Sequence, residues 1–243
     1  MTSSAESERS YWQTSALERP GAWSNELLTL KMSEARVLLE KIRAFAVVLD
    51  GASTIVELGA GQGWASCIVR AERPEATVIA TELAPEALAT TGRWVDVVGA
   101  APSGAIGALA TAVPLADGSA DVVFAFAAAH HFDDMPSVLA EIERVLRPGG
   151  RALFFHEPSS PRWINGPAVR RVNAKRPAVP ENVLVYSDVV DAAAACGLEC
   201  TLHFAPTTTA RGPVETLYYL MVSRSRRLQR TLPCTIDYEF RKP

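Results

Sequence analysis

Residues 55–64 read IVELGAGQGW, and this segment constrains the fold of the chain more than any other. The apolar run at 54–58 is bounded by turn-forming residues and predicts a buried parallel strand. Three glycines follow at alternate positions, Gly59, Gly61 and Gly63, where the lack of a Cβ lets the backbone turn sharply and approach a ligand. A helix that begins near Gly63 would direct free N–H groups at that ligand. The segment therefore predicts a site for a small molecule with an anionic portion.

The spacing of the glycines distinguishes between classes of ligand. A dinucleotide-binding turn has the spacing Gly-x-Gly-x-x-Gly, whereas here Trp64 follows Gly63 and the spacing is Gly-x-Gly-x-Gly. The pattern ELGAGQG at 57–63 instead resembles motif I of the class I S-adenosylmethionine-dependent methyltransferases. A nicotinamide-dependent oxidoreductase is a less favoured alternative, and a tight turn without a ligand is a third interpretation.

Four further segments follow in the order that this methyltransferase family shows. They are TVIATE at 77–82, PLADGSADVVF at 114–124, VLAEIERVLRPGG at 138–150 and RALFFHE at 151–157. The first of them ends in Glu82, where this architecture places a carboxylate on a ribose diol. The resemblance covers roughly residues 50–160 and extends more weakly to 222.

The order of the apolar segments predicts an α/β fold. Strands are expected at 54–58, 77–82, 105–110, 120–126 and 151–156, and helices at 63–72, 85–93, 135–146 and 187–196. Such alternation indicates βαβ units and a parallel sheet that is covered on both faces. Segments 198–205 and 216–222, joined without a helix, are expected to pair as an antiparallel hairpin. The resemblance accordingly implies a Rossmann-like, seven-stranded, mostly parallel sheet with an antiparallel terminal hairpin and helices on both faces.

The segments around this core differ from it in pattern. Residues 25–49 have helical periodicity that predicts one or two helices, with Ser24 or Ser33 as possible caps, and residues 1–20 are expected to be disordered or loosely attached. Five prolines after Glu157 predict an irregular excursion that covers the acceptor substrate. The chain would thus consist of an N-terminal helical cap at 1–50, a core at 51–222 with a lid insertion at 158–186, and a C-terminal tail at 223–243.

Composition argues against several classes of partner. The net charge is −3 and the pI is about 5.9, so no overall positive field would attract nucleic acid or an anionic membrane. The first residues lack the pattern of a signal peptide and no apolar run is long enough to span a membrane, which favours a cytoplasmic location.

Four scattered cysteines and the lack of a clear His/acid constellation predict no disulfide framework and no metal. We expect a small-molecule partner and a monomer or homodimer.

The resemblance implies S-adenosyl-L-methionine as the cofactor and assigns its contacts. The residues so assigned are Glu57, Gly59, Ala60, Gly61 and Gly63 at the methionine portion, Glu82 at the ribose hydroxyls, Leu83 at the adenine ring, Ala110 and Thr111 near the adenine amino group, and Phe126 at the sulfonium. Many relatives carry an acid after the third strand that accepts from the adenine amino group, and Leu109 stands at that position here. Either backbone groups near Ala110 take this part, or the adenine is held less specifically.

Three histidines stand at the ends of expected strands. His130 and His131 follow the fourth strand, and His156 ends the fifth. An acceptor hydroxyl or amine must lose a proton, and histidine titrates near neutral pH, so each of the three is a candidate general base. Glu157 could orient His156 or accept the proton itself. In relatives such histidines often only line or brace the pocket, which stays an alternative.

Together these features predict a methyltransferase that acts on oxygen or nitrogen of a small molecule, such as a secondary metabolite. A protein of the same fold that binds the cofactor without methylating is the first alternative, because the acid after the third strand is missing. Fold alone does not name the acceptor.

Overall fold

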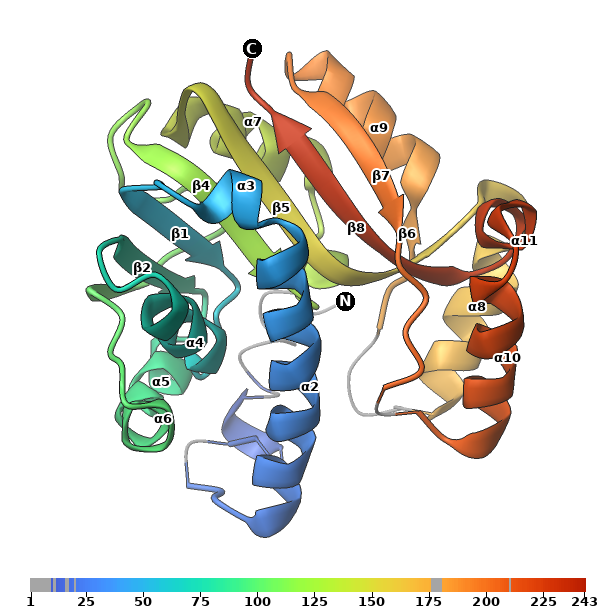
Figure 1. Cartoon of the computed structure of the whole chain (residues 1–243), viewed down its shortest axis with the longest axis horizontal. Coiled ribbons are helices and arrows are strands. Elements are labelled where there is room, and N and C mark those ends of the chain that lie inside the picture. Colours follow the sequence, from blue (N-terminus) through green and yellow to red (C-terminus); the bar gives the residue numbers. More distant parts are fainter. Residues whose placement is uncertain (1–9, 11, 16–17, 20, 176–180, 210) are drawn as a thin grey trace.

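The computed structural model describes residues 10, 12–15, 18–19, 21–175, 181–209 and 211–243, which are built around one sheet (Figure 1). Its strands are β1 (Thr54–Leu58), β2 (Thr77–Glu82), β3 (Gly104–Gly107), β4 (Ala120–Phe126), β5 (Leu146–Ser160), β6 (Leu184–Val185), β7 (Glu199–Phe204) and β8 (Cys234–Arg241). Their order is β3-β2-β1-β4-β5-β8-β7, and the short β6 pairs with β5. β8 runs antiparallel to both neighbours, whereas the other pairs are parallel. The prediction of a Rossmann-like, mostly parallel sheet with an antiparallel end is confirmed, with β6 as an additional strand.

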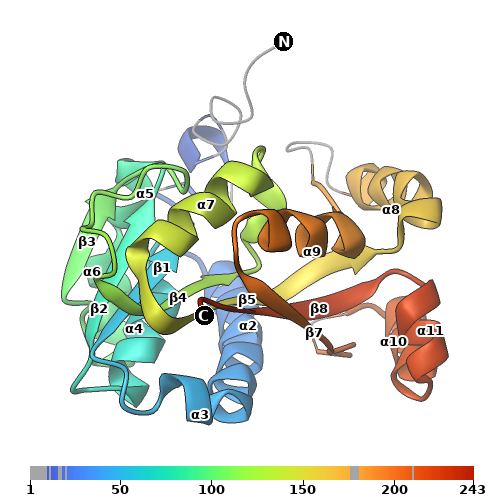
Figure 2. The same ribbon diagram turned by 90° about the horizontal axis from the view of Figure 1, so that it is seen from above.

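Helices cover both faces of this sheet (Figure 2). They are α2 (Asn25–Ala44), α3 (Ala46–Leu49), α4 (Trp64–Glu72), α5 (Pro85–Leu88), α6 (Thr91–Val98), α7 (Met135–Val145), α8 (Arg162–Lys175), α9 (Tyr186–Ala195), α10 (Pro213–Ser223) and α11 (Arg226–Thr231), with a 3₁₀ turn η1 (Ala129–His131) after β4. Helices α2, α4 and α6 share one hydrophobic core, and α7 and α9 share the other. Among the described residues, no helix is both long and apolar enough to cross a membrane.

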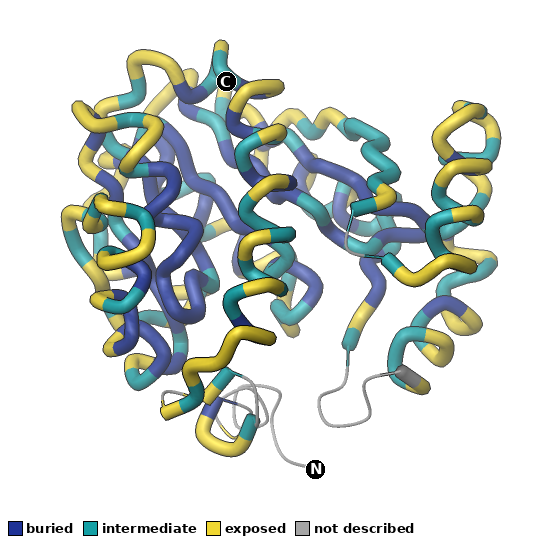
Figure 3. Tube along the Cα trace, turned by 60° about the horizontal axis from the view of Figure 1, so that its bottom comes forward, coloured by how far each residue is buried: buried dark blue, intermediate teal, exposed yellow. Residues whose placement is uncertain are grey.

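Strand β5 shows why the central strands contain continuous apolar runs. Phe154 belongs to the core that contains Leu139 of α7, while its neighbour Phe155 belongs to the core that contains Ile42 of α2. Successive side chains of a strand point to opposite faces, so the part of a strand that is covered on both sides forms a near-continuous apolar run, here residues 152–155. The strands accordingly form the buried centre of the molecule (Figure 3). Because such runs end sharply, β1, β2 and β4 have the bounds that the sequence predicts.

The predicted terminal hairpin is wrong in one of its two strands. Residues 216–222 belong to helix α10, and the strand that pairs with β7 is β8, within the segment expected to form a C-terminal tail. Helix α10 begins with Pro213 at its first position, where the missing N–H costs nothing. Its apolar residues Leu217, Tyr218 and Met221 also recur at helical spacing, a pattern that the aromatic content of the segment hid.

The insertion expected at 158–186 is not irregular in its described part. Strand β5 continues to Ser160, helix α8 follows with Pro167 inside it, and β6 lies before α9. Residues 176–180, which hold two of the five prolines, lie outside the described residues. The prolines at 158 and 161 sit at the end of β5 and just before α8, positions where a missing N–H is tolerated.

The N-terminal helix forms where its pattern predicts it. The Ser24 Oγ accepts a hydrogen bond of 3.2 Å from the Leu27 N–H and caps α2, as expected. The expectation of loose attachment at 1–20 falls largely on residues outside the described ones. Within the described part, however, Trp12 is buried, so this residue does not lie free in solvent.

Candidate active site

A cavity of about 1280 Å³ lies where β1, β2, β3 and β4 end. Residues of α2 line it on one side and residues of α8 and α10 on the other, three helices that extend past the ends of these strands (Figure 1). Open α/β sheets bind ligands at this edge. Small-molecule pockets typically measure about 300–1,000 Å³, so this cavity has room for two ligands at once.

The glycine turn between β1 and α4 closes one end of the cavity. Gly59, Gly61 and Gly63 have φ angles of 67°, 52° and 78°, a left-handed conformation that side chains disfavour. A Cβ at Gly61 would lie 2.9 Å from the Trp12 ring, and one at Gly63 would lie 2.6 Å from the Thr91 Oγ1. The turn thus needs glycine for its conformation and for the close approach of its neighbours.

Glu82 holds the glycine turn against the end of β2. Its Oε2 accepts a hydrogen bond of 2.8 Å from the Gly61 N–H, and its Oε1 accepts one of 3.0 Å from the Ala84 N–H. Burial raises the pKa of this carboxyl above its usual range, and the two N–H groups oppose that effect. Glu82 also lines the cavity, so the same side chain holds the turn and faces the cavity.

Glu57 is a second buried acid at this end of the cavity. Its Oε2 accepts a hydrogen bond from the Ser66 hydroxyl, one turn into α4. Burial is the main cause that raises the pKa of Glu57 to about 7. A cation brought beside this carboxyl would favour its ionised form.

Three rings from different elements line the middle of the cavity. The rings of Trp64 and Phe126 meet edge to face with centroids 5.4 Å apart, and Phe126 stacks on His156 with an interplanar angle of 8°. Aromatic rings exclude water and present a negative face to cations. This wall joins the glycine turn to the region of the histidines.

His156 is held in an unusual backbone conformation. Its φ of 63° is positive, which is uncommon for a residue other than glycine, and its N–H donates a 2.9 Å hydrogen bond to Asp237 Oδ1. The buried Nδ1 atom has no hydrogen-bond partner among the described residues. Burial, with the positive charges of Arg211 and Lys41, lowers the pKa of His156 to about 4. The imidazole is therefore neutral near pH 7, and its surroundings disfavour the protonated form.

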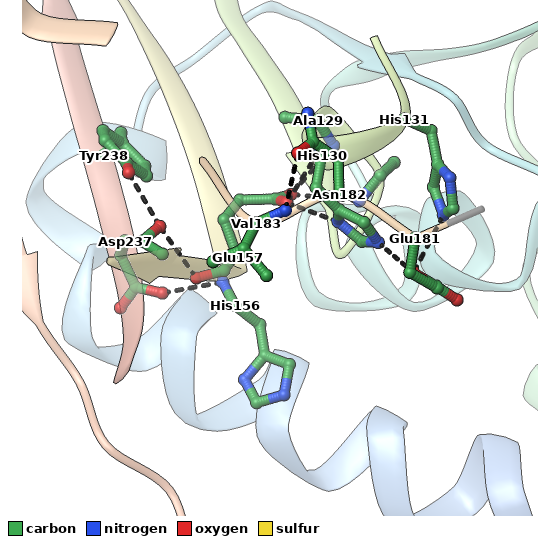
Figure 4. Close-up of polar contacts among 12 residues, drawn as sticks. Ala129, His130, His131, His156, Glu157, Glu181, Asn182, Val183, Asp237 and Tyr238 are labelled. Atoms are coloured by element: carbon green, nitrogen blue, oxygen red, sulfur yellow. Dashed lines mark hydrogen bonds and ion pairs between the residues drawn. The ribbon is translucent and has the colours of Figure 1, made fainter. Parts of the chain in front are cut away.

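His130 is engaged through both ring nitrogens (Figure 4). Its Nδ1 lies 2.8 Å from Glu157 Oε2, and its Nε2 lies 3.0 Å from Glu181 Oε2. Burial lowers the pKa of His130, but the two carboxylates outweigh it and raise the pKa to about 9. Glu157 is itself fixed by the N–H groups of Ala128 and Ala129. An imidazole paired in this way is a poor general base, which favours the bracing alternative for His130, and the contacts of Glu157 are with His130 and η1 rather than with the His156 ring.

His131 lies beside this pair and is more exposed. Its ring centroid is 4.1 Å from that of His130, and its Nε2 is 3.8 Å from Glu181 Oε2. Glu181, from the segment before β6, was not identified from the sequence, since no motif marks it. Glu181 is distant from both histidines in the sequence, and the fold brings it next to them.

The far end of the cavity is formed by residues that sequence reasoning missed. The Arg211 guanidinium lies 3.5 Å from the ring centroid of Tyr219, and that of Arg171 lies 5.9 Å from the ring centroid of Tyr218. Arg211 also pairs with Glu215 at 4.0 Å. These residues come from α8, from α10 and from the residues just before α10. The helical periodicity of α10 was the signal that could have placed its tyrosines here.

The structure brings most of the predicted site residues to this one cavity. Its lining includes Glu57, Gly59, Ala60, Gly61, Glu82, Leu83, Ala110, Thr111 and Phe126, together with His130, His131 and His156. Gly63 does not line the cavity and instead caps the N-terminus of α4. Leu109, at the position of the missing acid, lines the wall and is half exposed.

Comparison with known sequences gives matches over the first part of the sheet. Residues 56–154 match the family described as a methyltransferase domain. The chain is 30% identical over 142 residues to a demethylmenaquinone methyltransferase of Thermus thermophilus, covering 58% of this chain and 64% of that protein. It is 32% identical over 161 residues to a malonyl-(acyl-carrier protein) O-methyltransferase of Hahella chejuensis, covering 60% of this chain and 51% of that protein. The chain thus spans less than two thirds of either relative.

Solved structures match the fold over the whole length. The geranyl diphosphate C-methyltransferase of Streptomyces coelicolor, solved with Mg²⁺, geranyl diphosphate and S-adenosyl-L-homocysteine, has a TM-score of 0.71 to this chain. The match covers 100% of this chain and 99% of that one at 16% sequence identity. At this identity the likeness concerns the fold alone.

Proposed function

We propose that this chain, which carries a methyltransferase domain of the S-adenosylmethionine-dependent class I fold, transfers a methyl group from S-adenosyl-L-methionine to oxygen or nitrogen of a small molecule. One observation carries the proposal: a single cavity joins the glycine turn and Glu82 to His131 and His156. A methyl donor at the turn and an acceptor at the histidines would share one enclosed space. Holding two reactants in line can supply much of the catalysis of a displacement reaction.

The cofactor end of the cavity fits S-adenosyl-L-methionine. A carboxylate has about four lone-pair sites, and the two N–H groups bound to Glu82 leave others for the ribose hydroxyls. Glu57 lines the same end of the cavity, where the amino group of the methionine portion would favour its ionised carboxylate. We assign Phe126 to the sulfonium side, because an aromatic face attracts a cation. Once bound, the cofactor supplies a methyl group activated on its sulfonium.

The residues of the chain would then orient the acceptor and remove its proton. His156 lines the cavity and its Nδ1 has no partner among the described residues, so it is the candidate base that we favour, although its lowered pKa makes it a weaker base than a free imidazole. His131, which also lines the cavity, is the second candidate. His130 would serve to fix this wall rather than to accept the proton.

The far end of the cavity indicates the chemical class of the acceptor. Tyr218 and Tyr219 offer apolar ring surface, and Arg171 and Arg211 offer guanidinium donors beside it. Arg211 stacks on Tyr219 but already donates from Nε to the Thr207 carbonyl and pairs with Glu215, so the Arg171 guanidinium is the one that we assign to a carboxylate or phosphate. We therefore propose an acceptor with an apolar body and an anionic group.

A methyl-transfer assay on the full chain tests this proposal. The chain would be incubated with isotopically methyl-labelled cofactor and a panel of apolar hydroxy and amino compounds, each with and without a carboxylate or phosphate. Labelled O-methyl or N-methyl product from the anionic members is the expected outcome. Labelled C-methyl product would overturn the proposed reaction type. Cofactor binding without transfer to any member would favour the second candidate, a binding protein of the same fold, for which the absent acid at Leu109 is the motivating observation.

A further inference from the structure

Three metal-ligating atoms meet at one wall of the cavity, and methyl transfer alone does not explain why. His130, His131 and Glu181 each offer one ligand atom, and all three atoms lie within 4.8 Å of one another. All three residues line the cavity. The sequence predicted no metal, because Glu181 lies 51 positions from His130 and only the fold brings them together.

Glu157 orients His130 in the manner of a ligand to a metal. Its Oε2 lies 2.8 Å from His130 Nδ1, on the side of the ring away from Glu181 (Figure 4). Metal-ligating histidines almost always donate their second ring N–H to a carboxylate or carbonyl, which fixes the tautomer and the ring orientation. The N–H groups of Ala128, Ala129 and His130 hold Glu157 in turn, so the direction of His130 Nε2 is fixed by two layers of contacts.

We propose that His130 Nε2, His131 Nε2 and Glu181 Oε2 form a binding site for a divalent transition-metal ion of the zinc class. Ligand atoms at about 2.0–2.2 Å from a tetrahedral Zn²⁺ lie about 3.3 Å from one another. The two imidazole nitrogens lie 3.0 and 3.8 Å from the Glu181 oxygen, on either side of that value. Two imidazoles and one carboxylate suit zinc, whereas Mg²⁺ prefers oxygen ligands throughout.

Three protein ligands leave a fourth position, which is the arrangement of catalytic rather than structural zinc sites. Because the three residues line the cavity, a molecule within it could take that position. This part of the inference rests on the proposed function: an acceptor hydroxyl bound to the ion would lose its proton more readily than a free one. Metal binding itself does not depend on methyl transfer.

Metal titration of the untagged full chain tests the site. After treatment with EDTA and dialysis, Zn²⁺ affinity is measured against a chromophoric chelator, and Co²⁺ serves as a spectroscopic probe. One equivalent of each ion should bind, and Mg²⁺ should not compete. His131→Ala and Glu181→Gln should each weaken Zn²⁺ binding by at least about 100-fold, since even the loss of a supporting contact costs 10–100-fold. Circular dichroism establishes that each variant is folded.

Matched controls separate this site from adventitious binding. His203→Ala removes a histidine that pairs with Glu239 away from the cavity, and the double variant Cys196→Ser/Cys200→Ser removes the two half-buried thiols. Both should bind Zn²⁺ as the unmodified chain does. The inference is overturned if no stoichiometric binding occurs, if Glu181→Gln binds with unchanged affinity, or if Co²⁺ shows a thiolate band that the cysteine variant abolishes. S-adenosyl-L-homocysteine should bind Glu181→Gln normally, so failure of the metal site is distinguishable from failure of the proposed function.

Discussion

The imidazole of His156 lies parallel to the ring of Phe126, with 8° between the planes and 5.8 Å between the centroids. The two residues come from neighbouring strands, Phe126 from the end of β4 and His156 from within β5. The stack, the positive φ of His156 and its N–H bond to Asp237 fix the imidazole in place at the cavity wall. This places the imidazole beside the assigned sulfonium side, where a general base would have to lie, while its lowered pKa weakens it as a proton acceptor.

Replacement of His156 by asparagine should lower turnover by about 10²-fold or more, the lower range for loss of a general base. Asparagine tolerates the positive φ, so the backbone should keep its conformation. Affinity for S-adenosyl-L-homocysteine should not change, and His203→Ala is the control for removal of an unrelated histidine. Steady-state kinetics under saturating cofactor measures the effect. Near-normal turnover of His156→Asn would mean that catalysis here rests on positioning alone.

The same residue should make folding stability depend on pH. The pKa of His156 is lowered from 6.5 to about 4, so the unfolded chain binds more protons than the folded one between these values. The contribution of His156 to the free energy of unfolding is therefore complete above pH 6.5. It is lost as the pH falls towards 4, which lowers the free energy of unfolding by up to about 3 kcal/mol. Urea unfolding at pH 7.5 and 4.5 should show a smaller loss for His156→Asn than for the unmodified chain. An identical loss in both proteins would contradict this assignment.

Gly63→Ala should destabilise the fold more than Gly99→Ala does. Both glycines have a left-handed backbone, with φ of 78° and 82°, so both substitutions carry the strain of about 1–2 kcal/mol for that conformation. A Cβ added at Gly63 would lie 2.6 Å from the Thr91 Oγ1 and would clash with it. A Cβ added at Gly99 would have no such neighbour within 4 Å. Denaturant titration of the two variants isolates the clash. Equal destabilisation would show that Thr91 moves aside freely.

Glu82→Gln should weaken cofactor binding by about 1.5–3 kcal/mol, the range for a lost hydrogen bond to a charged group. Glutamine keeps the size of the side chain and one carbonyl acceptor for the Gly61 N–H, but its NH2 group cannot accept from the Ala84 N–H, so the stability of the variant is measured alongside its affinity. Glu72→Gln, an exposed acid at the end of α4, is the matched control. Calorimetric titration with S-adenosyl-L-homocysteine gives both affinities. An unchanged dissociation constant for Glu82→Gln would move the ribose site elsewhere.

The parts of the fold that the sequence predicts well are those set by local patterns. Strands β1, β2 and β4 are apolar runs bounded by turn formers, and their limits follow from the residues alone. The segment of helix α10 was expected to be a strand because TLYYLMV is rich in residues that suit strands, whereas in the helix Leu217 and Met221 are exposed and Val222 is buried. The intrinsic preference of residues for helix or strand is a weak guide, because most of the stability of a helix in a protein comes from tertiary packing of one of its faces.

The candidate site divides in the same way. Gly59, Gly61 and Glu82 belong to one local motif and its neighbouring strand, so their meeting is predictable from the resemblance. Glu181 and Arg211 stand in segments without a motif and reach the cavity only because α8 and α10 lie at the same end of the sheet. The pairing of His130 with Glu157 depends on the close approach of η1 to β5, a tertiary contact that residue spacing does not encode.

The most direct test of the account is a calorimetric titration of the full chain with S-adenosyl-L-homocysteine and, separately, with NADH. The glycine turn, Glu57 and Glu82 predict one binding site per chain for S-adenosyl-L-homocysteine and no binding of NADH. Binding of NADH without binding of S-adenosyl-L-homocysteine would contradict the assignment of this cavity to methyl transfer.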